Sequence, residues 1–331
     1  MKIAIVGGGW IGCHLANKLI GSHSIVIYEK NDRLFNETSY NNQNRLHLGF
    51  HYPRNYDTRE MCKNTFQRFM FDYGFLTEEV KDNLYCIPKN KSIVDFKTYK
   101  QIFEIFEQKE IPHKLINVEG CINTNERYID FKKASDFFNN SLKEVKIQQT
   151  ITEEDLNNLA KDFDLVINAT NNSLPISNQD YFFEVTLSLI YNIKSQTYFD
   201  ALTLMDGPFF SIYPYDKNRI TLTDVEHTPL KKFYKIEDLF KFKQTIEDNL
   251  IADKQNLMEK KVKEFFPDFL EHFSYSDYFI SIKTKIISNS DSRYPVIEKN
   301  GNVINCFSGK IQGIYIIEDY INQIINENIN R

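Results

Sequence analysis

The sequence predicts an α/β protein in which a parallel, ligand-binding sheet is combined with a second, mainly antiparallel sheet. Three observations lead to this prediction. A strand, a glycine-rich turn and a helix follow one another in residues 1–20, an apolar strand at 162–171 ends in small and turn-forming residues, and several strands separated by turns fill 182–225. A chain of 331 residues is too long for one simple core, so we expect two domains.

The first strand runs into glycines with G-x-G-x-x-G spacing, in the segment IAIVGGGWIG at residues 3–12. In this motif Gly7 allows a tight turn, Gly9 lets the backbone approach a pyrophosphate, and Gly12 lets the helix pack closely on the strand. The phosphates would lie beside the backbone of Trp10 and Ile11, where unpaired N–H groups and the helix dipole favour an anion. The spacing predicts a dinucleotide site; a glycine-rich turn without a ligand is the alternative.

A second apolar strand, at residues 24–28, ends in Glu29 and Lys30. Glu29 follows Gly7 by 22 residues, which is the spacing at which an acidic side chain accepts hydrogen bonds from a ribose. An acid at this point repels a 2′-phosphate. The pattern therefore favours FAD or NAD over NADP.

Composition excludes several classes of partner. The net charge is −5, so neither nucleic acid nor an anionic membrane surface is expected to bind. No apolar stretch reaches transmembrane length without charges, and no secretory signal is recognisable. The five cysteines form no C-x-x-C pair, which argues against a disulfide framework or a zinc site. We expect reduced thiols and a cytoplasmic protein; no oligomeric state is predicted.

The segment 44–54 is the second informative stretch, because it gathers two histidines, two arginines, a tyrosine and a glycine in eleven residues. A surface loop seldom needs so many groups of this kind. A helix is expected from about residue 57 to 73, followed by a region at 84–142 in which short strands and helices alternate. In that region we expect strands at 84–88, 114–116 and 128–129, and helices at 99–108 and 132–142.

The rest of the chain is expected to return to the first sheet, leave it, and return once more. The strand at 162–171 belongs to that sheet; strands at 182–193, 201–205, 209–215 and 219–225 form the antiparallel one. Helices follow at 236–251 and 253–266, then a strand at 303–307 and a final helix at 313–325. The predicted domains are therefore discontinuous, with residues 1–80, 160–178 and 288–331 binding the dinucleotide and residues 81–159 and 179–287 binding the substrate.

These motifs resemble the D-amino-acid oxidase (DAO) superfamily of FAD-dependent oxidoreductases. The turn with Glu29 is similar to its ADP-binding fingerprint, and 44–52 resembles the flavin-side segment of L-2-hydroxyglutarate dehydrogenase-like and sarcosine or glycine oxidase-like members. Residues 164–170 resemble the family's V-I-N-A-T-G strand end, with Asn171 in place of the glycine; asparagine tolerates the left-handed conformation needed there. The resemblance implies a glutathione-reductase-type, Rossmann-like FAD-binding domain with noncovalent FAD.

The resemblance also implies which residues contact the cofactor. Besides the glycine turn, these are Asn44, Arg45, Leu46, Ala169, Thr170, Gly309, Lys310 and Ile311. The last three would approach the pyrimidine end of the flavin, where the helix that follows and Lys310 add positive charge. Members usually carry more glycines at this point. Cys306 does not match the site at which some members attach flavin covalently.

The implied reaction is the transfer of a hydride from a carbon that bears an amine or a hydroxyl to flavin N5. An alcohol also needs a base, for which His47 is the first candidate and His51 the second; a structural role is the alternative for each. Arg54 and Arg293 are candidates to clamp a carboxylate or phosphate. For Arg293 a salt bridge to Asp291 or Glu298 is the alternative.

Tyr213 and Tyr215 lie two apart on one predicted strand, so they could line the substrate pocket or belong to the core. The expected substrate is a small polar molecule such as an amino acid, a 2-hydroxy acid or a sugar derivative. Residues 206–225 and 308–310 also resemble a branch found with surface-polysaccharide biosynthesis genes. Two other functions stay open: an NAD-dependent dehydrogenase, and a flavin-binding protein or mutase without net redox chemistry.

Overall fold

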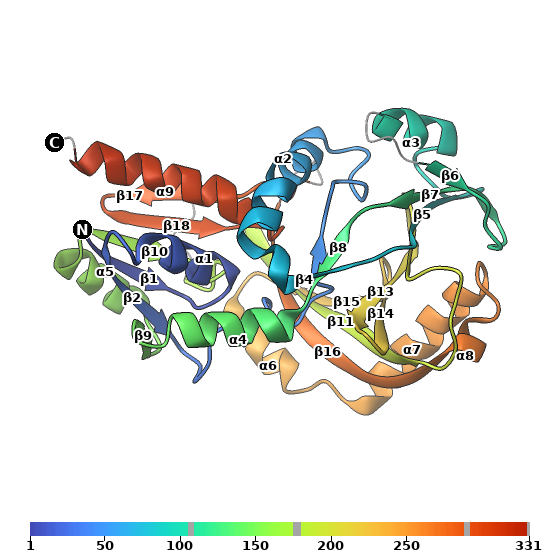
Figure 1. The fold of residues 1–331 in the computed structure, drawn as a ribbon. Coiled ribbons are helices and arrows are strands. Elements are labelled where there is room, and N and C mark those ends of the chain that lie inside the picture. The colour runs from blue at the N-terminus through green and yellow to red at the C-terminus, as the bar shows by residue number, and fades with distance from the viewer. Residues whose placement is uncertain (105–108, 175–179, 288–291, 330–331) are drawn as a thin grey trace.

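A computed structural model describes residues 1–104, 109–174, 180–287 and 292–329 of the chain. Two large sheets lie at opposite ends of an elongated molecule, and the two chain termini lie at the end that holds the smaller one (Figure 1). The predicted α/β fold with a parallel and a mainly antiparallel sheet is confirmed.

The first sheet has six strands in the order β17-β18-β10-β1-β2-β9. Their bounds are β1 Lys2–Val6, β2 Ser24–Glu29, β9 Lys146–Gln148, β10 Leu165–Asn168, β17 Val296–Asn300 and β18 Val303–Phe307. All neighbours are parallel except β17, which forms a hairpin with β18. The chain passes from β1 to β2 on one side, whereas β10 pairs on the other side. The carboxyl end of β1 is therefore a topological switch point, where open α/β sheets bind ligands.

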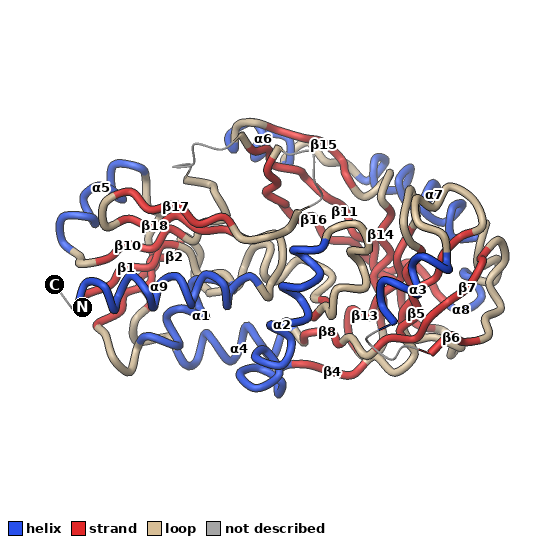
Figure 2. Tube along the Cα trace, turned by 90° about the horizontal axis from the view of Figure 1, so that it is seen from above, coloured by secondary structure: helices blue, strands red, loops and turns tan. Residues whose placement is uncertain are grey.

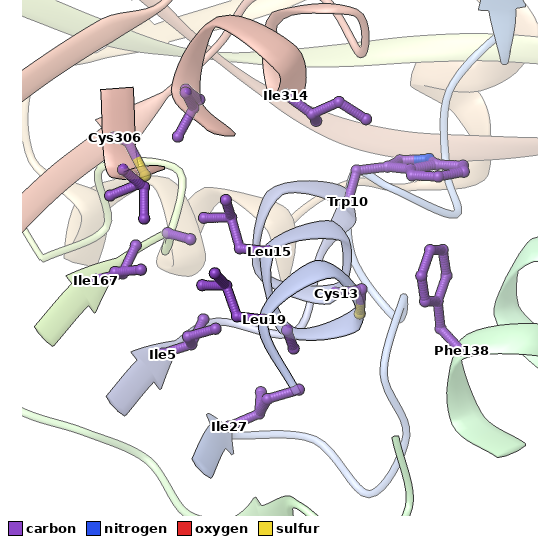
Figure 3. Packing of buried hydrophobic residues seen from close by; sticks show 14 of the residues in the cluster. Ile5, Trp10, Cys13, Leu15, Leu19, Ile27, Phe138, Ile167, Cys306 and Ile314 are labelled. Atoms are coloured by element: carbon purple, nitrogen blue, oxygen red, sulfur yellow. The ribbon is translucent and has the colours of Figure 1, made fainter. Parts of the chain in front are cut away.

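Helices cover both faces of this sheet (Figure 2). Helices α1 (Trp10–Leu19) and α9 (Gly313–Ile329) pack on one face, and α5 (Glu153–Asp162) packs on the other. In the core under α1, Leu15 and Leu19 point toward Ile5 of the sheet (Figure 3). Burial on both faces explains why these strands are continuous apolar runs rather than alternating ones.

The second sheet has nine strands, eight of them in the order β15-β11-β14-β13-β12-β5-β7-β6, with β16 paired to β11. Their bounds are β5 Asn83–Pro88, β6 Lys109–Ile111, β7 Val118–Thr124, β11 Tyr181–Ile193, β12 Ala201–Leu204, β13 Phe210–Asp216, β14 Arg219–Asp224, β15 Pro229–Phe233 and β16 Phe273–Ile286. The pairs are antiparallel apart from β12 with β5. The helices α3 (Phe96–Phe103), α6 (Ile236–Lys243), α7 (Asp248–Lys263) and α8 (Phe269–His272) flank this sheet.

A third, short sheet has the strand order β3-β8-β4. In the sequence, each of its strands occurs where the chain passes from one large sheet to the other. It consists of β3 Arg45–Leu46, β4 Thr77–Glu79 and β8 Arg127–Ile129, and it is accompanied by α2 (Tyr56–Tyr73), a 3-10 turn at Gly74–Leu76 and α4 (Phe131–Ser141). Asn55 caps α2 and Asp130 caps α4, each by accepting hydrogen bonds from backbone N–H groups of the first turn. These caps fix where both helices begin.

Several predicted elements differ from the structure. No strand forms at 114–116; the strands of this region are β6 and β7, on either side of that segment. Strand β16 is not predicted by the sequence pattern, because polar and charged residues interrupt its apolar ones. Strand β9 pairs with β2 in the first sheet although 81–159 was assigned to the substrate domain. The boundaries at 178–179 and 288 involve residues outside the described part, and the division into domains stays a prediction.

The expectation of reduced thiols is wrong for two of the five cysteines. Cys86 on β5 and Cys121 on β7 are direct register partners, with Cα atoms 4.1 Å apart, and they form a disulfide. Antiparallel pairing, which the cysteine count could not reveal, brings their sulfurs together. Cys13, Cys62 and Cys306 are free and buried. Among the described helices, none combines the length and the apolar character that a membrane crossing requires.

Candidate active site

A cavity of about 1100 Å³ is lined by residues of both large sheets. At one end it borders the glycine turn after β1, and at the other it borders β3, β12, β13, β16 and the segment after β18. Most of the residues singled out in the sequence line it. They are Gly7, Gly9, Trp10, Ile11, Glu29, Lys30, Asn44, Arg45, His47, His51, Arg54, Ala169, Thr170, Arg293, Gly309, Lys310 and Ile311.

The glycine turn has no room for side chains. Gly7 has φ +105°, and a Cβ built there would lie 2.6 Å from the carbonyl oxygen of Ala169. A Cβ on Gly12 would lie 1.9 Å from the carbonyl oxygen of Gly7, so Gly12 serves the close packing of α1 on β1 and does not line the cavity. The N-terminus of α1 has no side-chain cap at Gly9, although Ser39 accepts a hydrogen bond from Trp10 N at 2.9 Å. Backbone donors at this end can therefore face a bound anion.

Glu29 is held rigidly at the tip of β2. Its Oε2 accepts from Gly8 N at 2.7 Å, and its Oε1 accepts from the backbone and side-chain nitrogens of Asn31 at 2.9 and 2.8 Å. A carboxylate has further lone pairs, so Glu29 can also accept from ribose hydroxyls. Lys30 pairs with Glu37 at 2.9 Å beside the same part of the cavity.

The end of β10 forms the wall opposite Gly7. Thr170 Oγ1 donates to Asn168 Oδ1 at 2.8 Å, which ties the turn to the strand. Asn171 has φ +55°, so the expectation that it takes the left-handed conformation in place of a glycine is confirmed. Cys306 on the adjacent strand is buried, with its Sγ 3.6 Å from the carbonyl oxygen of Asn168. This thiol faces the sheet and belongs to the core rather than to the cavity lining.

The opposite part of the cavity is rich in positive charge and in nitrogen bases, and we call it the basic end. It consists of Arg45, His47, His51, Lys283, Arg293 and Lys310. These groups come from β3 and the loop after it, from β16, and from the segments on either side of the β17-β18 hairpin. The three-dimensional fold, rather than one motif, therefore creates the basic end.

Arg45 is a buried guanidinium without a carboxylate partner among the described residues. Its Nη1 donates to Thr203 Oγ1 at 2.8 Å, its Nη2 donates to Ser211 Oγ, and its guanidinium lies 3.9 Å from the ring centre of Tyr213. The residue is 6% exposed. A buried charge costs much free energy unless it is paired, so Arg45 favours a negatively charged or strongly polar group in the cavity.

His47 lies between Lys310 and a buried glutamate. Its Nε2 is 3.1 Å from Lys310 Nζ, and its Nδ1 is 3.6 Å from Glu126 Oε1, which is slightly beyond hydrogen-bond distance. Glu126 also accepts from Leu48 N at 2.7 Å and from Tyr85 Oη at 2.6 Å. The carbonyl oxygen of His47 accepts from Gln312 Nε2. The backbone and the imidazole of His47 are thus fixed from several sides.

Burial and charge shift the titration of the basic end. Desolvation lowers the pKa of His47 to about 4, and Lys310 acts in the same direction, whereas Glu126 opposes them. Desolvation also lowers the pKa of His51 well below its usual value, with Arg45 adding to the effect. The pKa of Lys310 falls to about 7 and that of Lys283 to about 8, in both cases mainly because the surrounding protein desolvates the amine.

Three further residues predicted for the site are Arg54, Arg293 and Leu46. Arg54 pairs with Asp206 at the cavity wall. Arg293 lines the cavity, and its backbone N donates to Thr58 Oγ1 at 2.9 Å; Asp291, one of its expected salt-bridge partners, lies outside the described residues. Leu46 is fully buried in the core, away from the cavity lining.

Tyr213 and Tyr215 are not among the residues that line the cavity. Tyr213 is buried under Arg45 and donates its hydroxyl to the carbonyl oxygen of Arg127 at 3.0 Å. Tyr215 packs against Phe131 and Phe279, with ring centres 4.9 and 6.0 Å away. Tyr213 contacts the basic end through the guanidinium of Arg45, which lies over its ring.

Three residues of this region are not predicted from the sequence: Glu126, Lys283 and Gln312. Lys283 had a usable signal, because Ile280, Ile282 and Thr284 alternate with Ser281 and Lys283 as in a strand with two unlike faces. Glu126 and Gln312 had none, since each is an isolated polar residue that becomes significant only beside His47.

The cavity fits FAD. The backbone cradle at Gly7, into which a Cβ would not fit, and the uncapped start of α1 suit the pyrophosphate, and Glu29 suits the ribose. The same cavity continues to the basic end, where donors and positive charge suit a ring system that becomes anionic on reduction.

Comparisons with known proteins agree with this fit. The family model described as DAO, FAD dependent oxidoreductase, matches residues 2–82. The chain is 32% identical to FPY4 of Fusarium mangiferae, named an FAD-dependent monooxygenase, over 98% of this chain and 91% of that protein. It is 26% identical to kojA of Aspergillus flavus, which has the same description, over 99% of this chain and 86% of that protein.

Solved structures share the fold at low sequence identity. L-alpha-glycerophosphate oxidase from Mycoplasma pneumoniae, with FAD bound, has a TM-score of 0.70 and 14% identity, with 98% of this chain and 94% of that chain covered. Glycine oxidase from Geobacillus kaustophilus has a TM-score of 0.67 and 9% identity, with the same coverage. At these identities the likeness shows the fold alone.

Proposed function

The chain belongs to the DAO family of FAD-dependent oxidoreductases, and from this premise we propose that it oxidises a small polar substrate at a carbon that bears a hydroxyl or an amine. It is an enzyme with FAD as its cofactor. Amino acids, 2-hydroxy acids and sugar derivatives are the candidate substrates. The observation that carries the proposal is the basic end, which combines buried cations with nitrogen bases beside one cavity.

Most of the predicted cofactor contacts fall into two groups, and Asn44, Arg45 and Leu46 belong to neither. The turn around Gly7, the start of α1 and Glu29 would hold the adenosine diphosphate half, while Ala169, Thr170 and residues 309–311 would hold the flavin half. When bound, FAD supplies the acceptor for the hydride. The protein must then hold the substrate carbon in line, keep water away and take up any proton that the substrate loses.

Arg45, Arg293 and Lys283 are suited to orient the substrate. A guanidinium offers a planar pair of donors to a carboxylate or phosphate, and at Arg45 two donors are already directed by Thr203 and Ser211. Its Nε is buried and has no hydrogen-bond partner among the described residues. Arg54 is engaged by Asp206 and is better suited to the rim of the cavity.

The test is anaerobic reduction of the bound flavin by a substrate panel of amino acids, 2-hydroxy acids and nucleotide sugars. Loss of the visible flavin band with one compound supports the proposal. A protein that purifies with a nicotinamide and without flavin would favour the dehydrogenase alternative, and a flavin that no panel member bleaches would favour a binding protein or mutase.

A second candidate is oxygen insertion, because FPY4 and kojA are both named monooxygenases. Turnover under ¹⁸O₂ distinguishes the two reactions by product mass. The proposed oxidation gives a product without ¹⁸O, whereas a monooxygenase gives a product that is heavier by one labelled oxygen.

Two finer predictions accompany the proposal. A cytoplasmic location is supported by the free thiols of Cys13, Cys62 and Cys306, whereas the Cys86–Cys121 disulfide weighs against it. A role in surface-polysaccharide biosynthesis is supported by sequence resemblance, and nucleotide sugars are in the panel for that reason.

A further inference from the structure

We propose that Lys310 is the group that accepts the proton of the substrate, and that Glu126 is a positioning residue that acts on Lys310 through His47. This inference rests on the proposed function, because only an oxidation at a hydroxyl or a protonated amine releases such a proton. It replaces His47, the first candidate from the sequence, as the base.

Lys310 is placed for this role by contacts from several elements. Its Nζ lies 3.1 Å from His47 Nε2 and 4.9 Å from the ring centre of Tyr52, and the side chain is half-buried at the cavity wall. The backbone at this point is pinned by Ser308, whose Oγ donates to the carbonyl oxygen of Lys310 at 2.8 Å. The amine can therefore reach a substrate in the cavity while its stem stays fixed.

The negative charge of Glu126, 3.6 Å from His47 Nδ1, influences which nitrogen of His47 carries hydrogen. Glu126 is fully buried and faces Nδ1, so it favours the form of the imidazole with hydrogen on Nδ1. In that form Nε2 is an acceptor, and it accepts an N–H from Lys310. A neutral amine that donates one N–H to His47 still has its lone pair, which is then free to face the cavity.

Desolvation and the surrounding cations keep about half of the Lys310 amine neutral near pH 7. The titratable or charged groups that act on it are His47, Cys62, Arg45, Lys283 and Arg293. Three of these are cations, and together with desolvation they lower the pKa of Lys310 to about 7, whereas burial leaves His47 with a pKa of about 4. A base is most effective when its pKa is near the working pH, which favours Lys310 over His47.

In the proposed oxidation the hydride would leave the substrate carbon with the electron pair of the C–H bond, and FAD, when bound, would accept it as the oxidant. The O–H bond, or one N–H bond of a protonated amine, breaks, and its proton bonds to the lone pair of Lys310 Nζ. The products would be a carbonyl compound or a protonated imine, together with the ammonium group of Lys310, which returns the proton to solvent after the product leaves.

The test measures the protonation of Lys310 without substrate, in the FAD-bound protein labelled with [¹³Cε]lysine. The Lys310 signal, assigned from its loss in Lys310→Met, is followed by NMR from pH 5 to 11. We expect a midpoint near pH 7 in the wild type and a lower midpoint in Glu126→Gln, which keeps the side-chain size but removes the negative charge.

Glu184→Gln is the matched control. Glu184 is also a buried carboxylate of the cavity, but it pairs with Lys285 at 2.6 Å, so this substitution should leave the Lys310 midpoint unchanged. A Lys310 midpoint above pH 10 would overturn the assignment of Lys310. An unchanged midpoint in Glu126→Gln would overturn the positioning role of Glu126. Neither result depends on the substrate panel, so failure of the proposed function is seen separately.

Discussion

The amine of Lys310 and Nε2 of His47 lie 3.1 Å apart, although 263 positions separate the two residues in the chain. His47 follows β3 and Lys310 follows β18, and both segments end at the same cavity. The contact places two nitrogen bases beside Arg45, Lys283 and Arg293. Charges so close together must alter one another's pKa values, and the pH dependence of the reaction rate should reflect this.

The pH dependence of the reaction should follow Lys310. With the substrate that the panel identifies, kcat/KM should rise as pH increases through about 7, because the ammonium form below that pH has no lone pair to accept a proton. Lys310→Met should remove this rise and slow flavin reduction about 10²-fold or more. Stopped-flow reduction at several pH values measures both effects.

Lys285→Met is the control for that experiment, because Lys285 pairs with Glu184 and does not contact His47. The variant should keep the rise in rate near pH 7. If Lys310→Met kept it as well, another group would be the proton acceptor.

His47→Ala should separate reduction from cofactor binding. The substitution removes the acceptor that holds the amine of Lys310, while the backbone carbonyl that accepts from Gln312 remains. We expect flavin reduction to slow by more than tenfold, with FAD affinity little changed, since a lost hydrogen bond that positions a reacting group costs mainly rate. Equal losses in rate and affinity would assign His47 to holding the cofactor.

Gly12→Ala should weaken both folding and FAD binding. The added methyl would lie 1.9 Å from the carbonyl oxygen of Gly7, so α1 must move off β1, at a cost of about 1–3 kcal/mol or more. Thermal unfolding and titration with FAD measure the two effects. Gly21→Ala is the control, because a Cβ there meets nothing within 4 Å; it should leave both quantities close to those of the wild type.

Removal of the disulfide should lower the free energy of unfolding without changing the structure of the basic end. Cys86 and Cys121 are 35 positions apart, and the entropy of a loop of that length corresponds to about 4 kcal/mol of stabilisation in the chain-entropy model. The double substitution Cys86→Ala and Cys121→Ala should therefore unfold at a lower temperature or lower urea concentration. Mass analysis of the unreduced wild type, with two hydrogens fewer than the reduced chain, checks that the bond is present.

Local patterns predicted the first sheet well. The glycine spacing, the apolar runs of β1, β2 and β10 and the left-handed turn at Asn171 depend on neighbouring residues, so they are visible in the sequence. The strand β16 was missed because it mixes lysines and serines with isoleucines. Its partner β11 is apolar and buried over most of its length. The apolar run made β11 recognisable as a strand in the sequence.

The chemistry of the basic end was harder to predict, because it depends on distance in space. His47 was selected for its usual pKa near neutrality, but burial and the cations around it remove that advantage. Glu126 became important only once the fold placed it 3.6 Å from His47. The Cys86–Cys121 bond likewise required the register of β5 with β7, which composition does not contain.

The order of strands in the first sheet has a consequence for synthesis on the ribosome. The glycine turn is made long before β18, which pairs with β10, and before the Lys310 segment that follows β18. In a nascent chain one edge of β10 therefore stays unpaired until Val303–Phe307 has been translated. Premature termination before Val303 would release a chain with that edge open to intermolecular pairing, and such fragments should aggregate rather than fold.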